Sequence, residues 1–211
     1  PVRKRFGSLE CNVITEDFLI RMKDAGFCDF FHLSMQSGCD TTLKAMNRHY
    51  TSDEYYEKCQ LIRKYIDNPA FTTDVIVGFP GETEEDFEET LKIYNELKYD
   101  LAYTFIYSPR EGTPAAKIKD DVPLEEKEER LQRLNKVVNK YARENNEKYK
   151  DKIVPVLIEG YSDKGGKLMG YTDTMKLVNV LGDPSNIGSI KQVHITEVKT
   201  WSMEGEIVSG K

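Results

Sequence analysis

Residues 72–83 read Thr-Thr-Asp-Val-Ile-Val-Gly-Phe-Pro-Gly-Glu-Thr and contain a strand, a glycine turn and the start of a helix. The β-branched run Val75–Val77 is typical of a parallel strand that is covered on both faces. Gly78 and Gly81 then allow the backbone to turn sharply and a ligand to approach it closely. Thr83, with an acidic residue three positions later, predicts a capped helix.

This turn admits two interpretations. In barrel enzymes the loop that follows a strand is where ligands bind. A strand, a Gly-x-x-Gly turn and an acidic helix start therefore indicate a binding loop. The alternative is an ordinary connection between a strand and a helix, because glycine is the usual residue at such turns. The spacing alone leaves both interpretations open.

Strands alternate with helices on either side of this turn. The patterns predict strands at Val2–Phe6, Phe30–Met35, Thr72–Val77 and Leu101–Tyr107. They predict helices over about 15–25, after Asp40, after Thr51 (with a capping box to Glu54) and over 123–149. Such alternation indicates βαβ units and a parallel sheet.

The pattern changes after Lys152. Short alternating segments follow, separated by Gly, Asp and Asn, at 153–159, 168–171, 176–180, 189–198 and 202–208. Several short strands at regular spacing predict a small antiparallel barrel. We therefore expect an α/β domain over residues 1–149 and a β-barrel domain over residues 150–211.

Composition limits the possible classes of protein. Of the 211 residues, 39% are hydrophobic, which is enough for a core, and 31% are charged, which indicates a soluble surface. No apolar run is long enough to span a bilayer and no hydrophobic signal segment stands at the N-terminus, so we expect a cytoplasmic protein without membrane contact. The net charge of −6 argues against a generally basic nucleic-acid-binding protein. Because the chain begins at Pro1 without an initiator Met, we interpret it as part of a longer protein.

The cysteines do not form a metal-binding pattern. Cys11, Cys28, Cys39 and Cys59 include no Cys-x-x-Cys pair and lie in no Cys/His cluster. A self-contained zinc or iron–sulfur site is therefore not expected in this chain. We interpret all four as buried thiols without a chemical role.

Polar residues gather where the predicted strands end. Gln36 and Ser37 close one strand, and their uncharged hydrogen-bonding groups suit orientation of a cofactor better than acid–base catalysis. Arg48, between two helices, is either a carboxylate-binding group or an ordinary surface arginine. The loop 107–116 has two prolines and a glycine, which fix an irregular shape. We interpret His32, inside a strand, as a core histidine with both ring nitrogens satisfied.

No catalytic dyad, phosphate-binding loop or metal-binding pair is present, so the chemistry of an enzyme built on this chain belongs to a bound cofactor. Taken together, the motifs resemble the radical S-adenosylmethionine (radical SAM) methylthiotransferases. The resemblance rests on four stretches and their order: His32–Gly38, Met46–Thr51, Thr73–Thr83 and Tyr107–Ala115. It covers nearly the whole chain, and it implies a partial (β/α) barrel followed by a small, OB-like, tRNA-binding barrel, the TRAM domain.

Within this family two substrates are open. The stretches Leu168–Thr174, Ile195–Ser202 and Phe105–Pro109 resemble members that act on isopentenyladenosine in tRNA. Leu33–Asp40 and Gly7–Glu10 resemble members that act on threonylcarbamoyladenosine. We favour isopentenyladenosine because the RNA-facing half supports it. A member that modifies a ribosomal protein is a third possibility, against which the Thr172–Thr174 stretch weighs.

The resemblance also implies the cofactors. The family cleaves S-adenosylmethionine reductively to a deoxyadenosyl radical, using two [4Fe–4S] clusters and a reductant such as flavodoxin. The Cys-x-x-x-Cys-x-x-Cys motif of the family is absent from these residues, so the cluster ligands are expected upstream and the chain alone is expected to be inactive. By resemblance, S-adenosylmethionine is expected to contact Gln36, Ser37, Arg48 and the turn Gly78–Gly81. No residue of this chain is assigned a catalytic or metal-binding role.

The expected partner of the TRAM segment is tRNA. Lysines and aromatic residues on a small barrel are typical of RNA-binding surfaces. The candidates are Lys167, Tyr171, Lys176, Lys199 and Trp201. For Trp201 a place in the barrel core is an equal alternative, since tryptophan is usually buried. A different class of function, an RNA-binding module on an inert half-barrel, also fits this chain.

Overall fold

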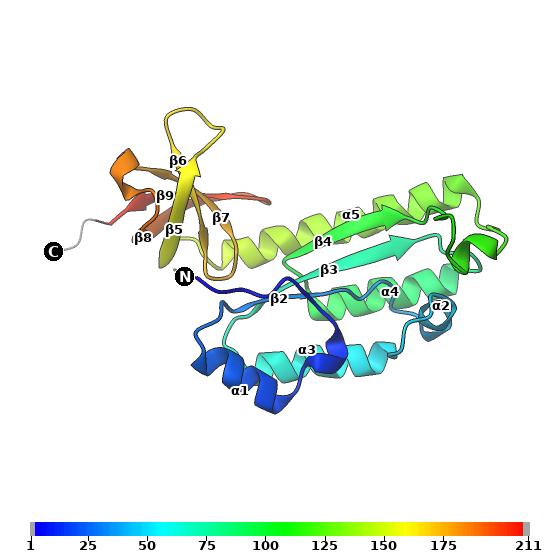
Figure 1. Cartoon of the computed structure of the whole chain (residues 1–211). Helices are drawn as coiled ribbons and strands as arrows, with labels where there is room; N and C mark the ends of the chain where they lie inside the picture. Colours follow the sequence, from blue (N-terminus) through cyan, green and yellow to red (C-terminus); the bar gives the residue numbers. More distant parts are fainter. Residues whose placement is uncertain (1–2, 209–211) are drawn as a thin grey trace.

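The computed structural model describes residues 3–208, which form an open α/β layer and a small β-barrel (Figure 1). The sheet contains four parallel strands in the order β1-β2-β3-β4. Their bounds are β1 Ser8–Leu9, β2 Phe30–Leu33, β3 Ala70–Val77 and β4 Leu101–Ile106. The helices are α1 Glu16–Asp24, α2 Asp40–Ala45, α3 Ser52–Tyr65, α4 Glu84–Leu97 and α5 Leu124–Glu147.

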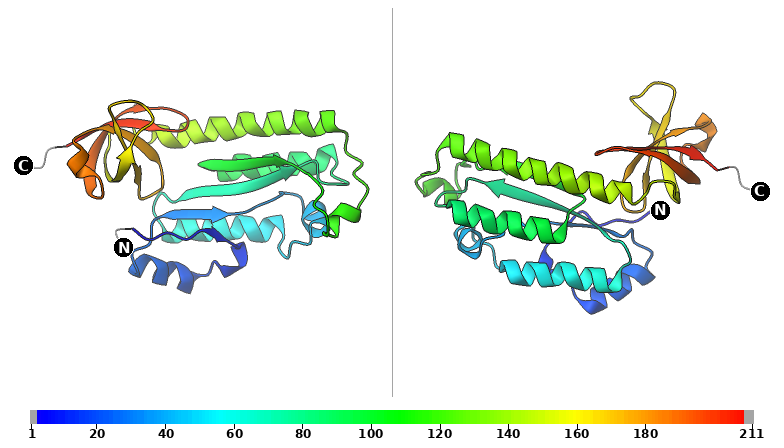
Figure 2. Two further views of the ribbon diagram at one scale, coloured as in Figure 1. Left: turned by 45° about the horizontal axis from the view of Figure 1, so that its top comes forward. Right: turned by 180° about the vertical axis from the view of Figure 1, so that it is seen from behind.

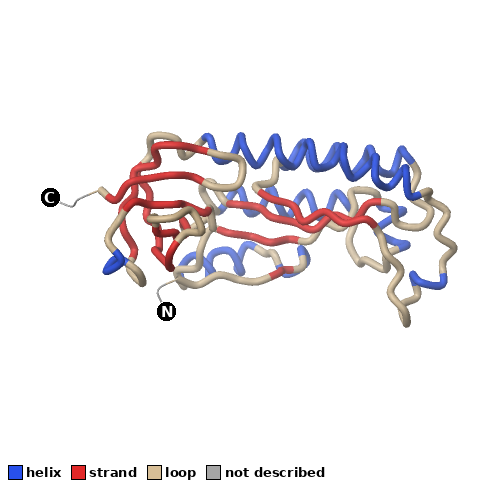
Figure 3. The backbone as a smooth tube through the Cα atoms, turned by 90° about the horizontal axis from the view of Figure 1, so that it is seen from above, coloured by secondary structure: helices blue, strands red, loops and turns tan. Residues whose placement is uncertain are grey.

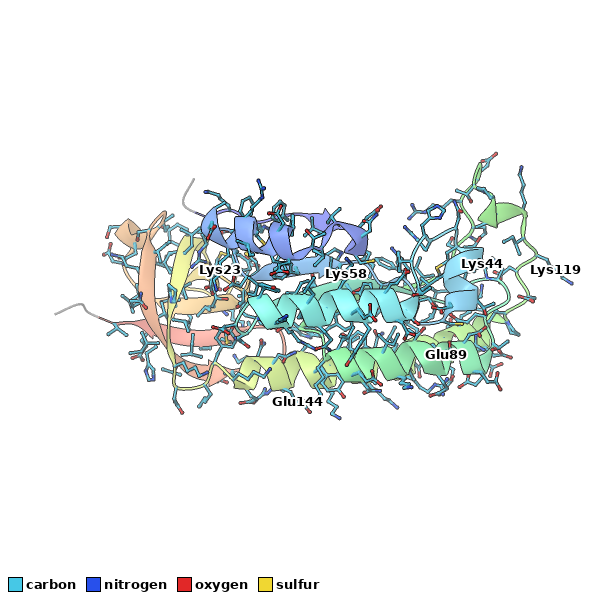
Figure 4. All side chains as sticks on the ribbon, turned by 90° about the horizontal axis from the view of Figure 1, so that it is seen from below. Lys23, Lys44, Lys58, Glu89, Lys119 and Glu144 are labelled. Atoms are coloured by element: carbon cyan, nitrogen blue, oxygen red, sulfur yellow. The ribbon has the colours of Figure 1, made fainter. Side chains whose placement is uncertain are left out.

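The long helices cover one face of this sheet. Seen from behind, α5, α4, α3 and α1 lie side by side in front of the strands (Figure 2). The residues that alternate toward these helices, such as Phe31, Leu33, Val75 and Val77, are almost fully buried and form the main core. Charged side chains such as Lys58, Glu89 and Glu144 lie on α3, α4 and α5 (Figure 4). The opposite face of the sheet carries no helix among residues 3–208, so the fold is a partial (β/α) barrel, as expected.

Two capping boxes fix the starts of α3 and α4. The Thr51 hydroxyl accepts from the backbone N–H of Glu54, and the Glu54 carboxylate accepts from the N–H of Thr51. Thr83 and Asp86 make the same reciprocal pair at the start of α4. Each pair satisfies two backbone donors that a helix end leaves free. Both predicted helix starts are therefore confirmed.

The predicted N-terminal strand is displaced along the chain. Val2 lies outside the described residues, and between Arg3 and Phe6 only Lys4 makes an isolated bridge, to Phe27. The strand is instead Ser8–Leu9, paired with β2. The reason is the packing of Phe6, whose ring stacks on that of Phe27 with centroids 4.3 Å apart, so this segment is held mainly by side chains.

Five strands close into a barrel in the order β5-β6-β7-β9-β8. Their bounds are β5 Ile153–Tyr161, β6 Leu168–Thr172, β7 Leu177–Leu181, β8 Ile190–Val198 and β9 Met203–Ile207. The expected small barrel is present, but it is mixed instead of antiparallel, because β7 and β9 pair in parallel. β8 lies between β7 and β9 in sequence, but it pairs with β5 and β9 and not with β7. β9 is therefore the strand that pairs with β7 when the barrel closes.

The barrel stands at one end of the α/β layer, beyond the end of α5 (Figure 3). Polar contacts join the two parts. Lys176 Nζ lies 2.5 Å from Asp100 Oδ1, and both side chains are largely buried. Arg3 donates to the carbonyl oxygens of Tyr171 and Pro155, and the Asn146 side chain donates to two carbonyls of the loop before β9. No helix within residues 3–208 combines the length and the apolar character that crossing a membrane requires.

Candidate active site and nucleic-acid interface

The uncovered sheet face carries a row of hydrogen-bonded polar side chains. Asp74 Oδ2 accepts from the Ser34 hydroxyl at 2.7 Å and lies 3.1 Å from His32 Nε2. His32 Nδ1 lies 2.7 Å from the Thr72 hydroxyl oxygen. Barrel interiors are normally packed with branched apolar residues. A polar network in this position indicates a ligand-binding face.

Aromatic side chains continue this row on the edge strand. Tyr103 stands beside Asp74 in the β3–β4 register, and Phe105 stands beside Ile76. Both residues are about half exposed, at 52% and 51%. Tyr103 borders a hollow of about 530 Å³ together with the polar row. The volume lies within the usual range of ligand pockets.

A second hollow leads from this face to the small barrel. It has a volume of about 510 Å³ and is lined by residues of both parts of the chain. Three predicted RNA-binding residues, Tyr171, Lys176 and Trp201, line it. The two hollows share the lining residues Arg5, Phe30, Thr72 and Tyr103. The uncovered sheet face and the barrel therefore border two adjoining hollows.

The predicted cofactor residues lie at the opposite end of the sheet. The arrowheads of β3 and β4 point away from the small barrel, so the carboxyl ends of the strands are far from it (Figure 1). Gln36 follows β2 there in a left-handed conformation, with φ of 65°. Its backbone pairs with β3, donating to the Asp74 carbonyl and accepting from Ile76 N–H. The polar strand end is thus tied to the neighbouring strand.

Ser37 is buried and faces a helix. Its hydroxyl oxygen lies 3.4 Å from the Thr90 hydroxyl oxygen of α4 and accepts from the N–H of Cys39. Gly38 N–H donates to the same Thr90 oxygen. A Cβ on Gly38 would lie 2.7 Å from the Thr90 Cα, so the close packing of this loop on α4 requires glycine. The Ser37 side chain therefore holds the loop in place.

Gly78 and Gly81 both have positive φ, at +71° and +84°. Gly78 N–H donates to the buried carboxylate of Glu82, which also accepts from Arg130 Nη1 at 3.1 Å. Burial raises the pKa of Glu82 although Arg130 and this N–H bond oppose the shift. A Cβ on Gly78 would overlap the Lys127 side chain at 2.3 Å, whereas nothing lies within 4 Å of the corresponding position at Gly81. The turn is therefore packed on α5 at Gly78 and open at Gly81.

Two further polar groups at this end of the sheet are able to bond a ligand. Arg48, which follows α2, has an exposed side chain. The Tyr107 hydroxyl, next to the Phe79 ring of the glycine turn, is buried and has no hydrogen-bond partner within residues 3–208. Buried polar groups normally have partners, so this hydroxyl is able to bond a ligand that binds beside it. This chemistry fits a polar cofactor at the carboxyl ends of the strands.

The predicted RNA-binding lysines have acidic neighbours. Lys167 Nζ lies 2.5 Å and Lys199 Nζ 3.4 Å from Glu204, and Lys176 pairs with Asp100. Burial raises the pKa of Glu204, but the bonds from Lys167 and Lys199 outweigh it and hold the value below its ordinary level. Trp201 is 51% exposed, which excludes the alternative of a core position.

The four cysteines are buried and free, as expected. Burial raises the pKa of Cys59 to about 12, so this thiol stays protonated at neutral pH. Within residues 3–208 no three His, Cys, Asp or Glu side chains are grouped closely enough to hold a metal ion.

Asp74, Tyr103, Arg5 and Phe30 were not among the predicted site residues. For Asp74 and Tyr103 the signal in the sequence was the two-residue alternation of β3 and β4, which places both opposite the apolar core. The ring of His32 is satisfied, as expected, but it lines the hollow instead of the core between sheet and helices.

Comparisons with known proteins agree with both parts of the fold. Residues 3–93 match the radical SAM superfamily and residues 147–208 match the TRAM domain. Coproporphyrinogen III oxidase from Escherichia coli, described as a radical SAM enzyme, superposes with a TM-score of 0.52 over 64% of this chain and 32% of that chain. The sequence identity is 22%, so this likeness concerns the fold alone. The chain therefore contains part of a radical SAM domain, followed by a TRAM domain.

Closer relatives define the family. The sequence is 51% identical over 196 residues to a Bacillus cytotoxicus protein named tRNA-2-methylthio-N(6)-dimethylallyladenosine synthase, and 50% identical to the protein of that name from Bacillus thuringiensis. The match covers 92% of this chain but only 38% of each relative. The chain is thus similar to part of the radical SAM tRNA methylthiotransferases, which confirms the resemblance found in its sequence.

Proposed function

We propose that the protein containing this chain adds a methylthio group to the adenine ring of isopentenyladenosine, next to the anticodon of tRNA. Isopentenyl and dimethylallyl name the same substituent, which the names of the relatives carry. One observation carries the proposal: two adjoining hollows lie between the polar sheet face and the TRAM barrel. RNA bound along these hollows would reach from the barrel to the sheet.

The family implies S-adenosylmethionine and iron–sulfur clusters. We infer that Gln36, Ser37, Arg48 and the Gly78–Gly81 turn hold S-adenosylmethionine, which supplies the radical that removes hydrogen from the target base. The exposed guanidinium of Arg48 suits a carboxylate, and the open Gly81 allows a ligand to approach the backbone. Two [4Fe–4S] clusters would be bound by residues outside this chain, and a cytoplasmic reductant such as flavodoxin would supply electrons.

On the RNA side, we infer that Tyr171 and Trp201 contact bases while Lys167, Lys176 and Lys199 set the local charge. The exposed Trp201 ring supports base stacking. We keep the division into residues 1–149 and 150–211, since α5 ends at Glu147 and β5 begins at Ile153. The barrel would then act as the RNA-binding unit.

Two alternatives remain as proposals. The N-terminal motifs Leu33–Asp40 and Gly7–Glu10 favour threonylcarbamoyladenosine as the substrate. The present chain by itself would be an RNA-binding module without catalysis. All of these proposals require that the chain binds RNA, and its affinity for an anticodon stem-loop RNA tests this requirement. Trp201→Ala should weaken binding about tenfold, as expected when a stacked base is lost. Ile20→Ala, at an exposed position of α1, should leave the affinity unchanged. Equal affinities of all three proteins would contradict the role of Trp201, and the absence of binding by all three would contradict the RNA-binding role.

A further inference from the structure

We propose that Asp74 and Tyr103 bind the target base of the RNA, with His32 and Ser34 as positioning residues for the Asp74 carboxylate. This inference rests on the proposed function and names the side chains that would recognise the base. It concerns the middle of the sheet face, which the expected cofactor and RNA residues leave unassigned.

The hydrogen bonds fix the carboxylate of Asp74. Because a carboxylate only accepts, His32 Nε2–H donates to Oδ2, and Nδ1 then accepts from the Thr72 hydroxyl. The Ser34 hydroxyl donates to the same Oδ2. Both nitrogens of His32 are thus occupied, and the ring holds Asp74 instead of binding a ligand itself. Among residues 3–208 no donor bonds to Oδ1, so this oxygen is available to a ligand.

Tyr103 provides an apolar surface beside this oxygen. It is paired with Asp74 across β3 and β4, and its ring centroid lies 6.0 Å from that of His32. Tyr103 is half exposed on the side of the sheet that carries no helix within residues 3–208. An exposed aromatic face next to a fixed acceptor is the arrangement that proteins use to stack a base and read its edge.

The position of this pair along the strands selects a base of the RNA as the ligand. The cofactor residues lie at the carboxyl ends of β2 and β3, and the TRAM barrel lies beyond the opposite ends (Figure 1). Asp74 is in the middle of β3, and Tyr103 borders both hollows. A base extruded from a strand in the interdomain hollow would reach Asp74 before it reached the cofactor end.

The chemistry of the carboxylate defines which base fits. Adenine with a single N6 substituent keeps one N6–H, which can donate to Asp74 Oδ1. Bonds to an ionised acceptor are stronger than neutral ones. Adenine with two N6 substituents has no such donor and would leave the carboxylate unpaired, which is costly. We therefore expect discrimination between singly and doubly substituted adenine.

The test compares two stem-loop RNAs bound by the complete gene product that contains this chain. One carries N6-isopentenyladenosine and the other N6,N6-dimethyladenosine at the target position. The protein should bind the first about tenfold more tightly. In Asp74→Asn the ratio should fall toward one, and in His32→Ala it should also fall. His32→Gln, whose amide can still donate to Asp74, should restore part of the affinity ratio that His32→Ala loses.

Two further variants complete the design. Tyr103→Leu should weaken both RNAs about tenfold without changing their ratio, and Tyr103→Phe should keep the affinity. Asp17→Asn, on the exposed side of α1, is the matched control and should keep both affinity and ratio. Thermal unfolding of each variant shows that the fold is retained.

Distinct outcomes overturn the inference and the proposed function. An unchanged ratio in both Asp74→Asn and His32→Ala would overturn the inference while the proposed function stands. Weaker binding of S-adenosylmethionine with unchanged RNA affinity in Asp74→Asn would also overturn it, because the hollow would then belong to the cofactor. Failure of the unmodified protein to bind either RNA would contradict the proposed function itself, and the inference with it.

Discussion

Gly78 and Gly81 have the same left-handed conformation for different reasons. A side chain at position 78 meets both backbone strain and the Lys127 side chain, whereas position 81 meets strain alone. Gly81→Ala should therefore cost about 1–2 kcal/mol of unfolding free energy. Gly78→Ala should cost clearly more, because Lys127 is buried and its Cγ must move. Urea unfolding of the two variants measures the difference; equal losses would contradict this account of Gly78.

The buried pair of Glu82 and Arg130 anchors the same turn. Their side chains are 2% and 4% exposed, so either charge left alone would lie in a poorly solvated place. We predict that Arg130→Met costs about 3–5 kcal/mol of unfolding free energy. The double variant Arg130→Met with Glu82→Gln should recover part of this loss, because it removes the uncompensated carboxylate. If the double variant is less stable by the sum of both single losses, the two residues are not coupled.

The raised pKa of Glu82 gives a pH dependence of definite sign. The folded protein holds this proton more tightly than the unfolded chain, whose carboxyl titrates near its ordinary value of 4.5. The resulting stabilisation is present below that value and is lost as the pH rises through the folded-state pKa. Relative to Glu82→Gln, the unmodified protein should lose stability as the pH rises above 4.5, the ordinary pKa of this carboxyl. If the unmodified protein instead gains stability over Glu82→Gln as the pH rises, the pKa of Glu82 is not raised in the folded protein.

At the scale of elements, the helix caps show what the sequence can predict well. Thr51 with Glu54, and Thr83 with Asp86, identify helix starts because the capping bonds are local. We predict that Thr83→Ala costs about 1 kcal/mol of unfolding free energy. Thr41→Ala, at an exposed position inside α2, is the control and should change it by less than about 0.5 kcal/mol. Equal effects would show that the cap does not stabilise α4.

Pairings between distant segments were harder to predict. The strands of the barrel were located to within a few residues, but the parallel pairing of β7 with β9 depends on closure around β5 and β8. The N-terminal strand was misplaced because an alternating apolar pattern does not distinguish a paired strand from an extended segment held by Phe6 and Phe27.

The candidate site was predicted only at the strand ends. Turn residues such as Gly78 and Gly81 mark a strand end, whereas the alternation of β3 shows only that Asp74 faces away from the apolar core. Its importance depends on the register that brings His32, Ser34 and Tyr103 around it. The same register moves His32 from the expected core to the hollow.

At the scale of the whole molecule, Lys176 joins the two parts of the chain. Its ion pair with Asp100 is nearly buried, so the side chain is not free to meet phosphate. We predict that Lys176→Met weakens binding of stem-loop RNA by disturbing the position of the barrel, with an unchanged slope of log affinity against log salt. Loss of a phosphate contact would reduce that slope by about 0.7–0.9. A reduced slope would therefore show that Lys176 contacts RNA directly.

The central claim concerns the reaction of the complete protein on tRNA. The most direct measurement is mass spectrometry of tRNA nucleosides from cells with and without the gene that encodes this chain. We predict that deletion removes methylthio-isopentenyladenosine and leaves isopentenyladenosine in its place. Loss of methylthio-threonylcarbamoyladenosine instead would show that the N-terminal motifs identify the substrate. An unchanged content of both methylthio nucleosides would contradict the proposed function.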